Sequence, residues 1–254
     1  MIALHGVTKA YGGVRAVKDL TLQLPERALF GLIGPNGAGK TTVLNLMTGL
    51  TAPTSGTITF GERRIDRAKP YEIAALGIAR TYQTSRLFAH MTALDNVVAG
   101  MHLKADDSLF GQLLGWPPTL ARARALRRRA RELLEELGLG DRADVEARNL
   151  AHGEQRRVEL ARAIAAQPSV LLLDEPAAGL NPVETERLRE EILRLVRQRG
   201  MSVLLVEHDM ALVMSACDRI AVLDFGEKIA EGTPAQVRND PRVVEAYLGV
   251  ESGA

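Results

Sequence analysis

The sequence has few of the residues that stabilise small secreted proteins by cross-links. Its 254 residues include one cysteine, Cys217, one tryptophan and only 4% aromatic residues. One cysteine excludes an intramolecular disulfide and a zinc site made of several cysteines, and it is typical of a reducing compartment. The 32 basic and 31 acidic side chains leave a net charge of +1, so no overall positive charge attracts nucleic acid or an acidic membrane.

Long apolar segments are also missing. The longest stretch without a charged residue, 41–61, contains seven threonines and three glycines. A membrane-spanning helix needs ~20 consecutive apolar residues, and this stretch does not supply them. The N-terminus lacks the basic start and apolar centre of a signal peptide. We therefore expect any role at a membrane to depend on a partner.

The residues that are present are typical of a globular α/β protein, with 46% hydrophobic and 25% charged side chains. We expect a single domain, 1–254, with a β-rich part at 1–83, a helical part at 84–165 and an α/β part at 166–254. In the last part, apolar runs alternate with helical patterns, which predicts a parallel sheet with crossover connections. The strands expected from apolar runs are 2–7, 16–24, 28–33, 170–173 and 203–206.

The helical part contains a run of arginines. The predicted helix 120–137 carries Arg122, Arg124, Arg127, Arg128, Arg129 and Arg131. A nucleic-acid patch is one interpretation. Three glutamates follow the run, and mixed charge of this kind favours the other interpretation, a solvated helix face. A second helix is predicted over 92–103, and glycines and two prolines predict a loop over 106–119.

The most specific motif is glycine-rich and lies between a predicted strand and a predicted helix. Residues 34–41 match G-x-x-x-x-G-K-[ST], the phosphate-binding P-loop. Glycines let backbone N–H groups surround phosphate oxygens, and the helix N-terminus adds the positive end of its dipole. Lys40 would contact the β- and γ-phosphates of ATP, and Thr41 would bind Mg²⁺. The predicted nucleotide-binding residues are Gly34, Pro35, Asn36, Gly37, Ala38, Gly39, Lys40, Thr41 and Thr42.

A pair of carboxylates follows the apolar strand 170–173. Burying charge is costly, so Asp174 and Glu175 at the end of a buried strand suggest a function. Asp174 would face Mg²⁺, usually through water, and Glu175 would polarise the water that attacks ATP. The alternative is an exposed acidic pair, but the P-loop upstream favours the catalytic interpretation.

Three further candidates are weak in isolation. His208 follows the strand 203–207, and a parallel sheet would bring it to the same edge as Asp174 and Lys40. Gln83 follows the segment 78–82 in a similar position. Tyr11 precedes two glycines and could stack on a base. A surface histidine and a packing tyrosine are the simpler alternatives.

The P-loop, the glutamine, the apolar strand with its Asp-Glu pair and the histidine occur along the chain as motifs that resemble those of the ATP-binding cassette (ABC) family. Residues 150–155, L-A-H-G-E-Q, are similar to that family's L-S-G-G-Q signature, and 177–181 are similar to its D-loop. The resemblance implies a P-loop ABC ATPase fold, in which a β-rich N-terminal subdomain is joined to a helical subdomain that bears the signature. It further implies that Tyr11 stacks on adenine, that Gln83 lies near Mg²⁺, and that His208 is the switch histidine.

The resemblance also implies a head-to-tail dimer with two ATP molecules. In such a dimer Ala151, Gly153 and Gln155 of the signature would contact ATP held by the other subunit. Ala151 stands where the signature has serine, and Asn181 stands where the D-loop often has aspartate.

Several segments narrow the resemblance to the LivG type of ABC ATPase, from branched-chain amino acid importers. They are 80–88, 150–153, 177–182, 207–210 and 232–249. This resemblance implies membrane permease subunits and, indirectly, an external substrate-binding protein. It favours a second, different ATPase as the dimer partner, with a homodimer as the alternative. It places the chain peripherally at the cytoplasmic face of the membrane, without nucleic acid. Urea or amide uptake and lipopolysaccharide export remain alternatives.

Other classes of P-loop protein fit less well. ABC proteins of DNA repair have a very long coiled coil before the signature, and this chain has no sustained heptads. Translation members usually carry two cassettes, whereas this chain has one P-loop. A small-molecule kinase would lack the signature-like helix start and the histidine after the strand. We therefore expect a transport ATPase.

Overall fold

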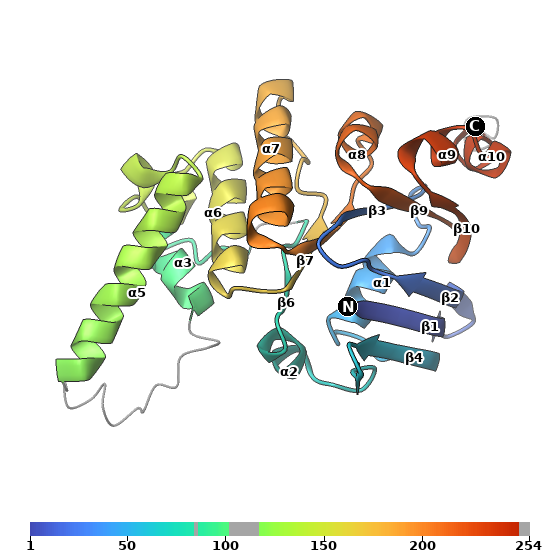
Figure 1. The fold of residues 1–254 in the computed structure, drawn as a ribbon, viewed down its shortest axis with the longest axis horizontal. Coiled ribbons are helices and arrows are strands. Elements are labelled where there is room, and N and C mark those ends of the chain that lie inside the picture. The colour runs from blue at the N-terminus through green and yellow to red at the C-terminus, as the bar shows by residue number, and fades with distance from the viewer. Residues whose placement is uncertain (84–85, 102–116, 249–254) are drawn as a thin grey trace. The chain divides into compact units, whose positions relative to one another are not determined.

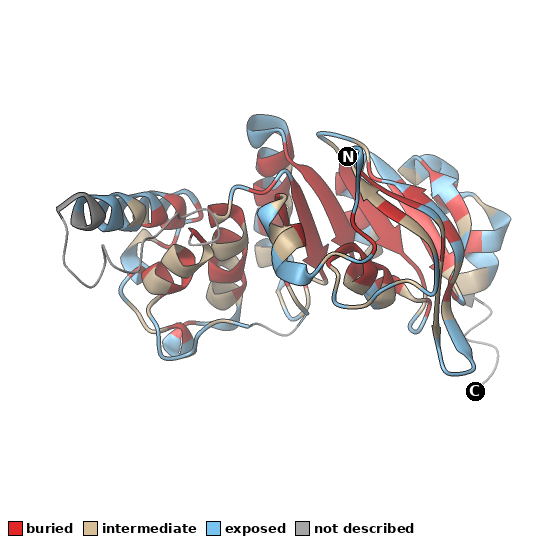
Figure 2. Ribbon diagram, turned by 90° about the horizontal axis from the view of Figure 1, so that it is seen from below, coloured by how far each residue is buried: buried red, intermediate tan, exposed pale blue. Residues whose placement is uncertain are grey.

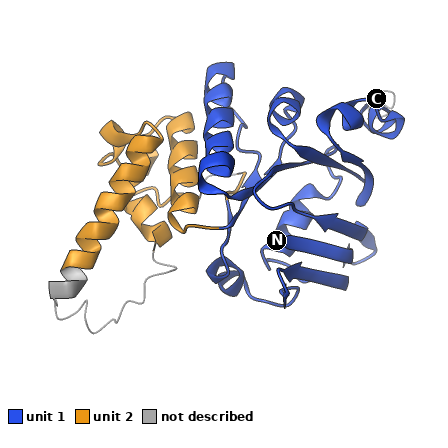
Figure 3. Cartoon of the chain, viewed as in Figure 1, with its two compact units in different colours: residues 1–80, 169–254 blue, residues 81–168 orange. Residues whose placement is uncertain are grey.

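The computed structural model describes residues 1–83, 86–101 and 117–248 (Figure 1). The chain forms two compact units, one of residues 1–80 and 169–254 and the other of residues 81–168 (Figure 3). The boundaries therefore differ by three residues at each end from the predicted helical part, 84–165. At the N-terminal boundary, Arg156 of the helical unit donates hydrogen bonds to the backbone carbonyl oxygens of Tyr82 and Gln83, which groups these residues with that unit.

The first unit contains a four-stranded antiparallel sheet in the order β2-β1-β4-β5. Val17, Leu20 and Leu22 are buried along β2, and the alternation with exposed residues is clear over residues 19–23, as expected of a half-buried strand. It is interrupted between Val17 and Leu20, where the pairing of β2 with β1 shifts register. The predicted strands 2–7 and 16–24 are confirmed, with somewhat different ends. The strands are β1 (Ile2–Tyr11), β2 (Val14–Gln23), β4 (Ser55–Phe60) and β5 (Arg63–Arg64).

The same unit contains a six-stranded sheet in the order β10-β9-β3-β8-β7-β6. Five strands are parallel, and β10 is antiparallel to β9. Every residue of β3, β7 and β8 is buried, as expected of parallel strands covered on both faces. The predicted parallel sheet is thus confirmed. The strands are β3 (Leu29–Ile33), β6 (Ile78–Arg80), β7 (Val170–Asp174), β8 (Ser202–Val206), β9 (Arg219–Asp224) and β10 (Glu227–Gly232).

Helix α1 (Lys40–Met47) packs between the two sheets of this unit (Figures 1 and 2). Its buried Leu44 belongs to one hydrophobic core with Leu4 of the antiparallel sheet and Leu172 of the parallel sheet. The segment that immediately precedes α1 is therefore anchored to a rigid core. Cys217 is also buried, and burial raises the pKa of its thiol to about 12, so it stays protonated at neutral pH.

Helix α7 (Pro182–Arg199) follows the D-loop-like segment. Asn181 precedes it and accepts hydrogen bonds from the N–H groups of Val183 and Glu184 at 3.0 Å each. Asparagine and aspartate cap helices about equally well, so Asn181 meets the structural requirement at this position. The helices of the first unit, besides α1, are α2 (Pro70–Ala75), α7 (Pro182–Arg199), α8 (Met210–Ala216), α9 (Pro234–Arg238) and α10 (Pro241–Leu248). None of the helices in the described ranges combines the length and apolar character that a membrane span requires.

The second unit consists mainly of the helices α3 (Ala93–Met101), α5 (Pro117–Glu136) and α6 (His152–Ala165). The predicted helices over 92–103 and 120–137 correspond to α3 and α5, and residues 102 and 103 lie outside the described residues. The loop predicted over 106–119 is wrong at its end, because residues 117–119 form the start of α5. Proline is tolerated in the first turn of a helix, where its missing N–H has no intrahelical partner. Residues 106–116 lie outside the described residues.

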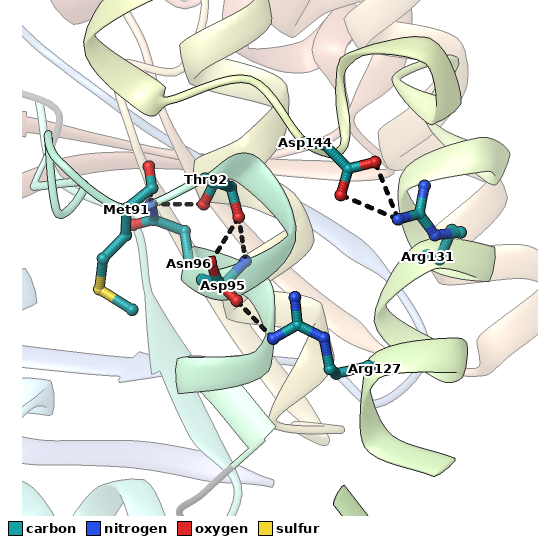
Figure 4. A network of polar contacts seen from close by, with 7 residues as sticks. All are labelled: Met91, Thr92, Asp95, Asn96, Arg127, Arg131 and Asp144. Carbon is teal, nitrogen blue, oxygen red and sulfur yellow. Dashed lines mark hydrogen bonds and ion pairs between the residues drawn. The ribbon is translucent and has the colours of Figure 1, made fainter. Parts of the chain in front are cut away.

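Polar contacts between helices organise this unit (Figure 4). Arg127 of α5 pairs with Asp95 of α3 at 2.7 Å, and Arg131 pairs with Asp144 at 2.9 Å. The buried Asn96 side chain accepts a hydrogen bond from the Phe88 N–H at 2.8 Å and donates to nearby backbone carbonyls. These pairs support the interpretation of the arginine run as a helix surface whose charges are balanced within the unit.

Candidate active site

The main candidate residues of the first unit lie at the carboxyl ends of three neighbouring strands. The P-loop follows β3, His208 follows β8, and Asp174 with Glu175 closes β7. Strand β8 lies between β3 and β7 in the sheet. The expectation that these motifs meet at one sheet edge is therefore confirmed, and such an edge is where open α/β sheets bind ligands.

The backbone of the P-loop has a shape that requires glycine at two positions. Gly39 has a φ of 104°, and a Cβ atom there would lie 2.4 Å from the Ala16 carbonyl oxygen. A Cβ on Gly34 would lie 2.0 Å from the Leu223 carbonyl oxygen. Because Gly39 precedes α1 and has no side chain, no side chain caps this helix end. The first-turn N–H groups of α1 can thus bind phosphate oxygens.

Lys40 holds its ammonium group inside the P-loop. Its Nζ atom donates hydrogen bonds to the carbonyl oxygens of Gly34 at 2.6 Å and Pro35 at 2.9 Å, and the residue is 8% exposed. Burial lowers the pKa of Lys40, whereas the nearby carboxylates of Glu175 and Asp174 raise it. The structure therefore brings the P-loop cation close to the acidic pair, as the sequence predicted.

Asp174 is buried and forms an ion pair that sequence reasoning missed. The Nη2 atom of Arg80 lies 2.8 Å from Asp174 Oδ2, and Arg80 Nη1 donates to Asn45 Oδ1 of α1 at 2.7 Å. Arg80 ends the short strand β6, beside β7. Arg80 is a charged residue at the end of a short strand that pairs with the strand of Asp174. This position is the signal that could have identified Arg80 as the partner of Asp174. Arg80 thus ties α1, which carries Lys40, to Asp174.

This ion pair leads to a prediction about stability. Arg80→Lys keeps the charge, but a lysine cannot reach both Asp174 and Asn45, because it lacks the planar fork of arginine. We expect the free energy of unfolding to fall by ~1.5–3 kcal/mol, the contribution of one hydrogen bond to a charged group. Urea denaturation of the nucleotide-free chain measures this change. Arg63→Lys, on the exposed strand β5, is the control, and an equal loss in both variants would contradict the prediction.

Glu175 and His208 are neighbours. Glu175 Oε1 lies 3.9 Å from His208 Nδ1, and the Glu175 N–H donates to the Val206 carbonyl at 2.9 Å. The backbone of Glu175 has a φ of 48°, an uncommon conformation for a residue other than glycine. Catalytic contacts are often long without substrate and tighten when it binds. The arrangement can accommodate a water molecule polarised by Glu175 next to a phosphate.

The residues present fit a magnesium ion that arrives with a nucleotide. Within the described part of the chain, no group of three or more His, Cys, Asp or Glu side chains could form a metal cage. Mg²⁺ usually keeps several waters and takes one or two carboxylates together with substrate phosphates. Asp174 and the hydroxyl of the exposed Thr41 provide such a partial donor set.

The signature-like residues lie in the second unit, at the start of α6. Ala151 precedes the helix with an extended backbone, and its N–H donates to the Glu154 carboxylate at 2.9 Å. The Gln155 side chain donates to the Leu150 carbonyl at 3.0 Å. Ala151 has no side-chain acceptor for the first-turn N–H groups of α6, so these groups are not capped by it.

Gln83 also belongs to the second unit, where α6 holds its backbone. Arg156, one residue after the signature-like segment, donates to the carbonyl oxygens of Tyr82 at 2.9 Å and of Gln83. Glu159 accepts from the Tyr82 N–H at 3.4 Å, and burial raises the pKa of its carboxyl group. Gln83 and the signature-like residues thus belong to one unit, whereas Lys40, Asp174, Glu175 and His208 belong to the other.

Comparisons with known proteins agree with this geometry. Residues 17–178 match the family "ABC transporter", and residues 227–252 match the family "Branched-chain amino acid ATP-binding cassette transporter". The chain is 47% identical to the high-affinity branched-chain amino acid transport ATP-binding protein LivG of Salmonella typhimurium, and 42% identical to BraF of Pseudomonas aeruginosa. Both alignments cover 98% of each chain. Identity to the lipopolysaccharide export ATP-binding protein LptB of Haemophilus influenzae is 33%, over 98% of this chain and 97% of that protein.

Solved structures show the same fold. A nucleotide-free ATP-binding cassette from an ABC transporter superposes with a TM-score of 0.85 at 29% identity, over 97% of this chain and 98% of that chain. A dimeric cassette bound to ADP and Pi has a TM-score of 0.79 at 28% identity, over 92% and 99% of the two chains. By its P-loop, by its fold and by these similarities, the chain belongs to the ABC transporter family as one of its nucleotide-binding ATPases.

Proposed function

We propose that the chain is the ATP-hydrolysing subunit of an importer for branched-chain amino acids. The observation that carries the proposal is the match of residues 227–252 to the branched-chain amino acid family, beyond the general cassette match at 17–178. The 47% identity to a LivG protein along almost the whole chain supports it. The lower identity to LptB, 33%, makes lipopolysaccharide export the weaker alternative. Uptake of urea or amides is a further alternative.

In the proposed mechanism, the P-loop binds the phosphates of ATP. The backbone N–H groups of residues 36–42 surround the oxygens, and the Lys40 ammonium exchanges its bonds to Gly34 and Pro35 for bonds to the β- and γ-phosphates. Thr41 and Asp174, with Gln83, would hold Mg²⁺, which would supply positive charge against the negative charge that develops on the phosphate during hydrolysis. Glu175 accepts a proton from the attacking water. His208, beside Glu175, binds the γ-phosphate oxygens.

We further propose that two cassettes complete each ATP site. Ala151, Gly153 and Gln155 would face the γ-phosphate of ATP that the partner holds, where the uncapped N-terminus of α6 is suited to an anion. ATP would then link the two subunits, and hydrolysis would release them. The LivG-like sequence favours a second, different ATPase as partner over a second copy of this chain.

Permease subunits would dock on the segment after Gln83. Phe88 is 54% exposed, and the exposed Met91 lies three residues further on. The buried Asn96 side chain holds this segment in place, with hydrogen bonds from its amide to the carbonyl oxygens of Phe88 at 3.1 Å and Met91 at 3.4 Å. Exposed apolar side chains on a firmly held loop are suited to a protein interface. Through such permease subunits the chain would lie peripherally at the cytoplasmic face of the membrane, with an external substrate-binding protein delivering the cargo.

Purification from native membranes tests the proposal. A His-tagged chain should copurify with its permease subunits and with the second ATPase. After reconstitution into vesicles, these proteins should accumulate labelled leucine when ATP and the binding protein are supplied, and the Glu175→Gln form is the inactive control. Accumulation of urea instead of leucine, or copurification with lipopolysaccharide-export proteins, would overturn the assignment of the cargo.

Tyr11 is predicted to stack on the adenine ring. It ends β1 and is 48% exposed, and Lys9 Nζ lies 4.9 Å from the centre of its ring. Stacking of a base on an aromatic side chain contributes ~1–3 kcal/mol, so we expect Tyr11→Ala to weaken ATP binding about 10-fold. Calorimetry should show little change for inorganic triphosphate, which has no base. Equal losses for both ligands would instead favour a packing role, and Tyr71→Ala, another exposed tyrosine, is the control.

A further inference from the structure

A buried carboxylate lies directly before the switch histidine. Glu207 is 1% exposed, and it follows the last residue of β8. Its Oε1 atom accepts a hydrogen bond from the Ala177 N–H at 2.7 Å, and its Oε2 atom accepts from the His208 N–H at 3.1 Å. The Asp209 N–H also interacts with this carboxylate. Glu207 thus binds the backbone of two segments that are about thirty residues apart in the sequence.

Each of these segments carries a candidate catalytic side chain. Ala177 lies two residues after Glu175, in a turn closed by a hydrogen bond from the Ala178 N–H to the Glu175 carbonyl at 3.2 Å. On the other side, Asp209 begins α8 by accepting hydrogen bonds from the N–H groups of Ala211 and Leu212. One carboxylate therefore connects the turn after Glu175 with the segment that carries His208.

The chemistry of this contact indicates more than packing. Burial is the largest influence on Glu207 and raises the pKa of its carboxyl group, although the backbone N–H groups and His208 oppose this. Burying a carboxylate in a protein core costs free energy. An apolar side chain could fill the same position after a buried strand without that cost. Hydrogen bonds from N–H groups to a carboxylate are stronger and shorter than neutral ones, so they fix the distance between the two segments.

We propose that Glu207 is a positioning residue, which holds the Glu175 turn and the His208 segment at a fixed separation so that both side chains meet the γ-phosphate together. The inference rests on the catalytic roles proposed above for Glu175 and His208. Glu207 itself does not contact the nucleotide. Removal of its carboxylate should leave nucleotide binding by the P-loop intact and impair the step in which Glu175 and His208 act.

Glu207→Gln tests the pair of hydrogen bonds that the carboxylate accepts from the two segments, with little change in the shape of the side chain. An amide has one carbonyl oxygen and one NH₂ group, so it can accept from only one of the two segments. We expect kcat for ATP hydrolysis to fall ~10- to 100-fold, since small misplacements of catalytic groups have effects of this order. The dissociation constant of ATP should change by less than about twofold. Glu191→Gln, which neutralises a buried glutamate in the middle of α7, is the matched control and should retain kcat.

A double-mutant cycle separates positioning from general destabilisation. Because the proposed role of Glu207 is to align His208 with Glu175, Glu207→Gln should lower kcat by a smaller factor in a chain that already carries His208→Ala than in the natural chain. Multiplicative losses of kcat in the double variant would overturn the proposal, as would an unchanged kcat for Glu207→Gln alone. Should the amide variant fold poorly, Glu207→Asp keeps the carboxylate but shortens its reach, and a normal kcat for that variant would likewise overturn the proposal.

The same cycle distinguishes this inference from the proposed catalytic role on which it rests. If His208→Ala alone hydrolysed ATP at the natural rate, the catalytic role of His208 would be overturned. The positioning role of Glu207 would be overturned with it. A large effect of His208→Ala, together with no effect of Glu207→Gln, would leave the catalytic role standing and overturn only the positioning role.

Discussion

Replacement of Glu175 by glutamine is expected to reduce ATP turnover ~10²–10⁴-fold, the usual contribution of a general base. The amide keeps the shape of the side chain at the end of β7, but it cannot accept a proton from water. The left-handed backbone at Glu175 and its N–H bond to Val206 do not involve the side chain, so its position should persist. Steady-state phosphate release measures the loss.

Binding of ATP by this variant should be nearly unchanged, because Lys40 and the P-loop backbone remain. With the partner ATPase present, ATP should trap the closed dimer, which sedimentation detects. Glu186→Gln, which removes an exposed carboxylate paired with Arg189 on α7, is the matched control and should hydrolyse ATP normally. Undiminished hydrolysis by the Glu175→Gln chain would exclude Glu175 as the general base.

Replacement of Lys40 by alanine is expected to weaken ATP binding by ~100-fold or more. Two hydrogen bonds to charged phosphate oxygens are lost, and each contributes ~1.5–3 kcal/mol. The loss should be large because the ammonium group is buried and already lies within the loop, at 2.6 Å from the Gly34 carbonyl oxygen. Equilibrium binding of a fluorescent ATP analogue to the purified chain gives the dissociation constant.

Two controls separate loss of binding from loss of structure. Lys228→Ala removes a lysine that pairs with Glu231 on β10, and it should bind ATP normally. Lys40→Arg keeps a positive charge but has a larger, planar head group, and it should bind more weakly than the natural chain. An affinity for ATP in Lys40→Ala equal to that of the unchanged chain would refute the P-loop assignment.

The elements that depend on neighbouring residues were predictable from the sequence. The P-loop, the apolar strand before Asp174 and the helix after Asn181 each arise from contiguous residues whose spacing specifies both the local structure and the chemistry. Strands β4, β5, β9 and β10 were not among the predicted strands. Strand β5 has only two residues and β10 carries three charged residues, whereas the apolar centre of β9, 220–223, is a signal that could have identified it. The start of α5 was placed too late, since prolines at a helix start resemble those of a loop.

Contacts between distant segments could be decided only by the tertiary structure. The ion pair between Arg80 and Asp174 joins two neighbouring strands whose residues are ninety-four positions apart, and the contact of Glu207 with Ala177 joins two loops. In the sequence, Gln83 reads as the end of the β-rich part, whereas hydrogen bonds from Arg156 group it with the signature helix. Local patterns thus predicted which residues carry the proposed chemistry. Only the packed sheet determined which buried charges hold those residues in place, because a buried charge is stable only next to partners that the folded chain supplies.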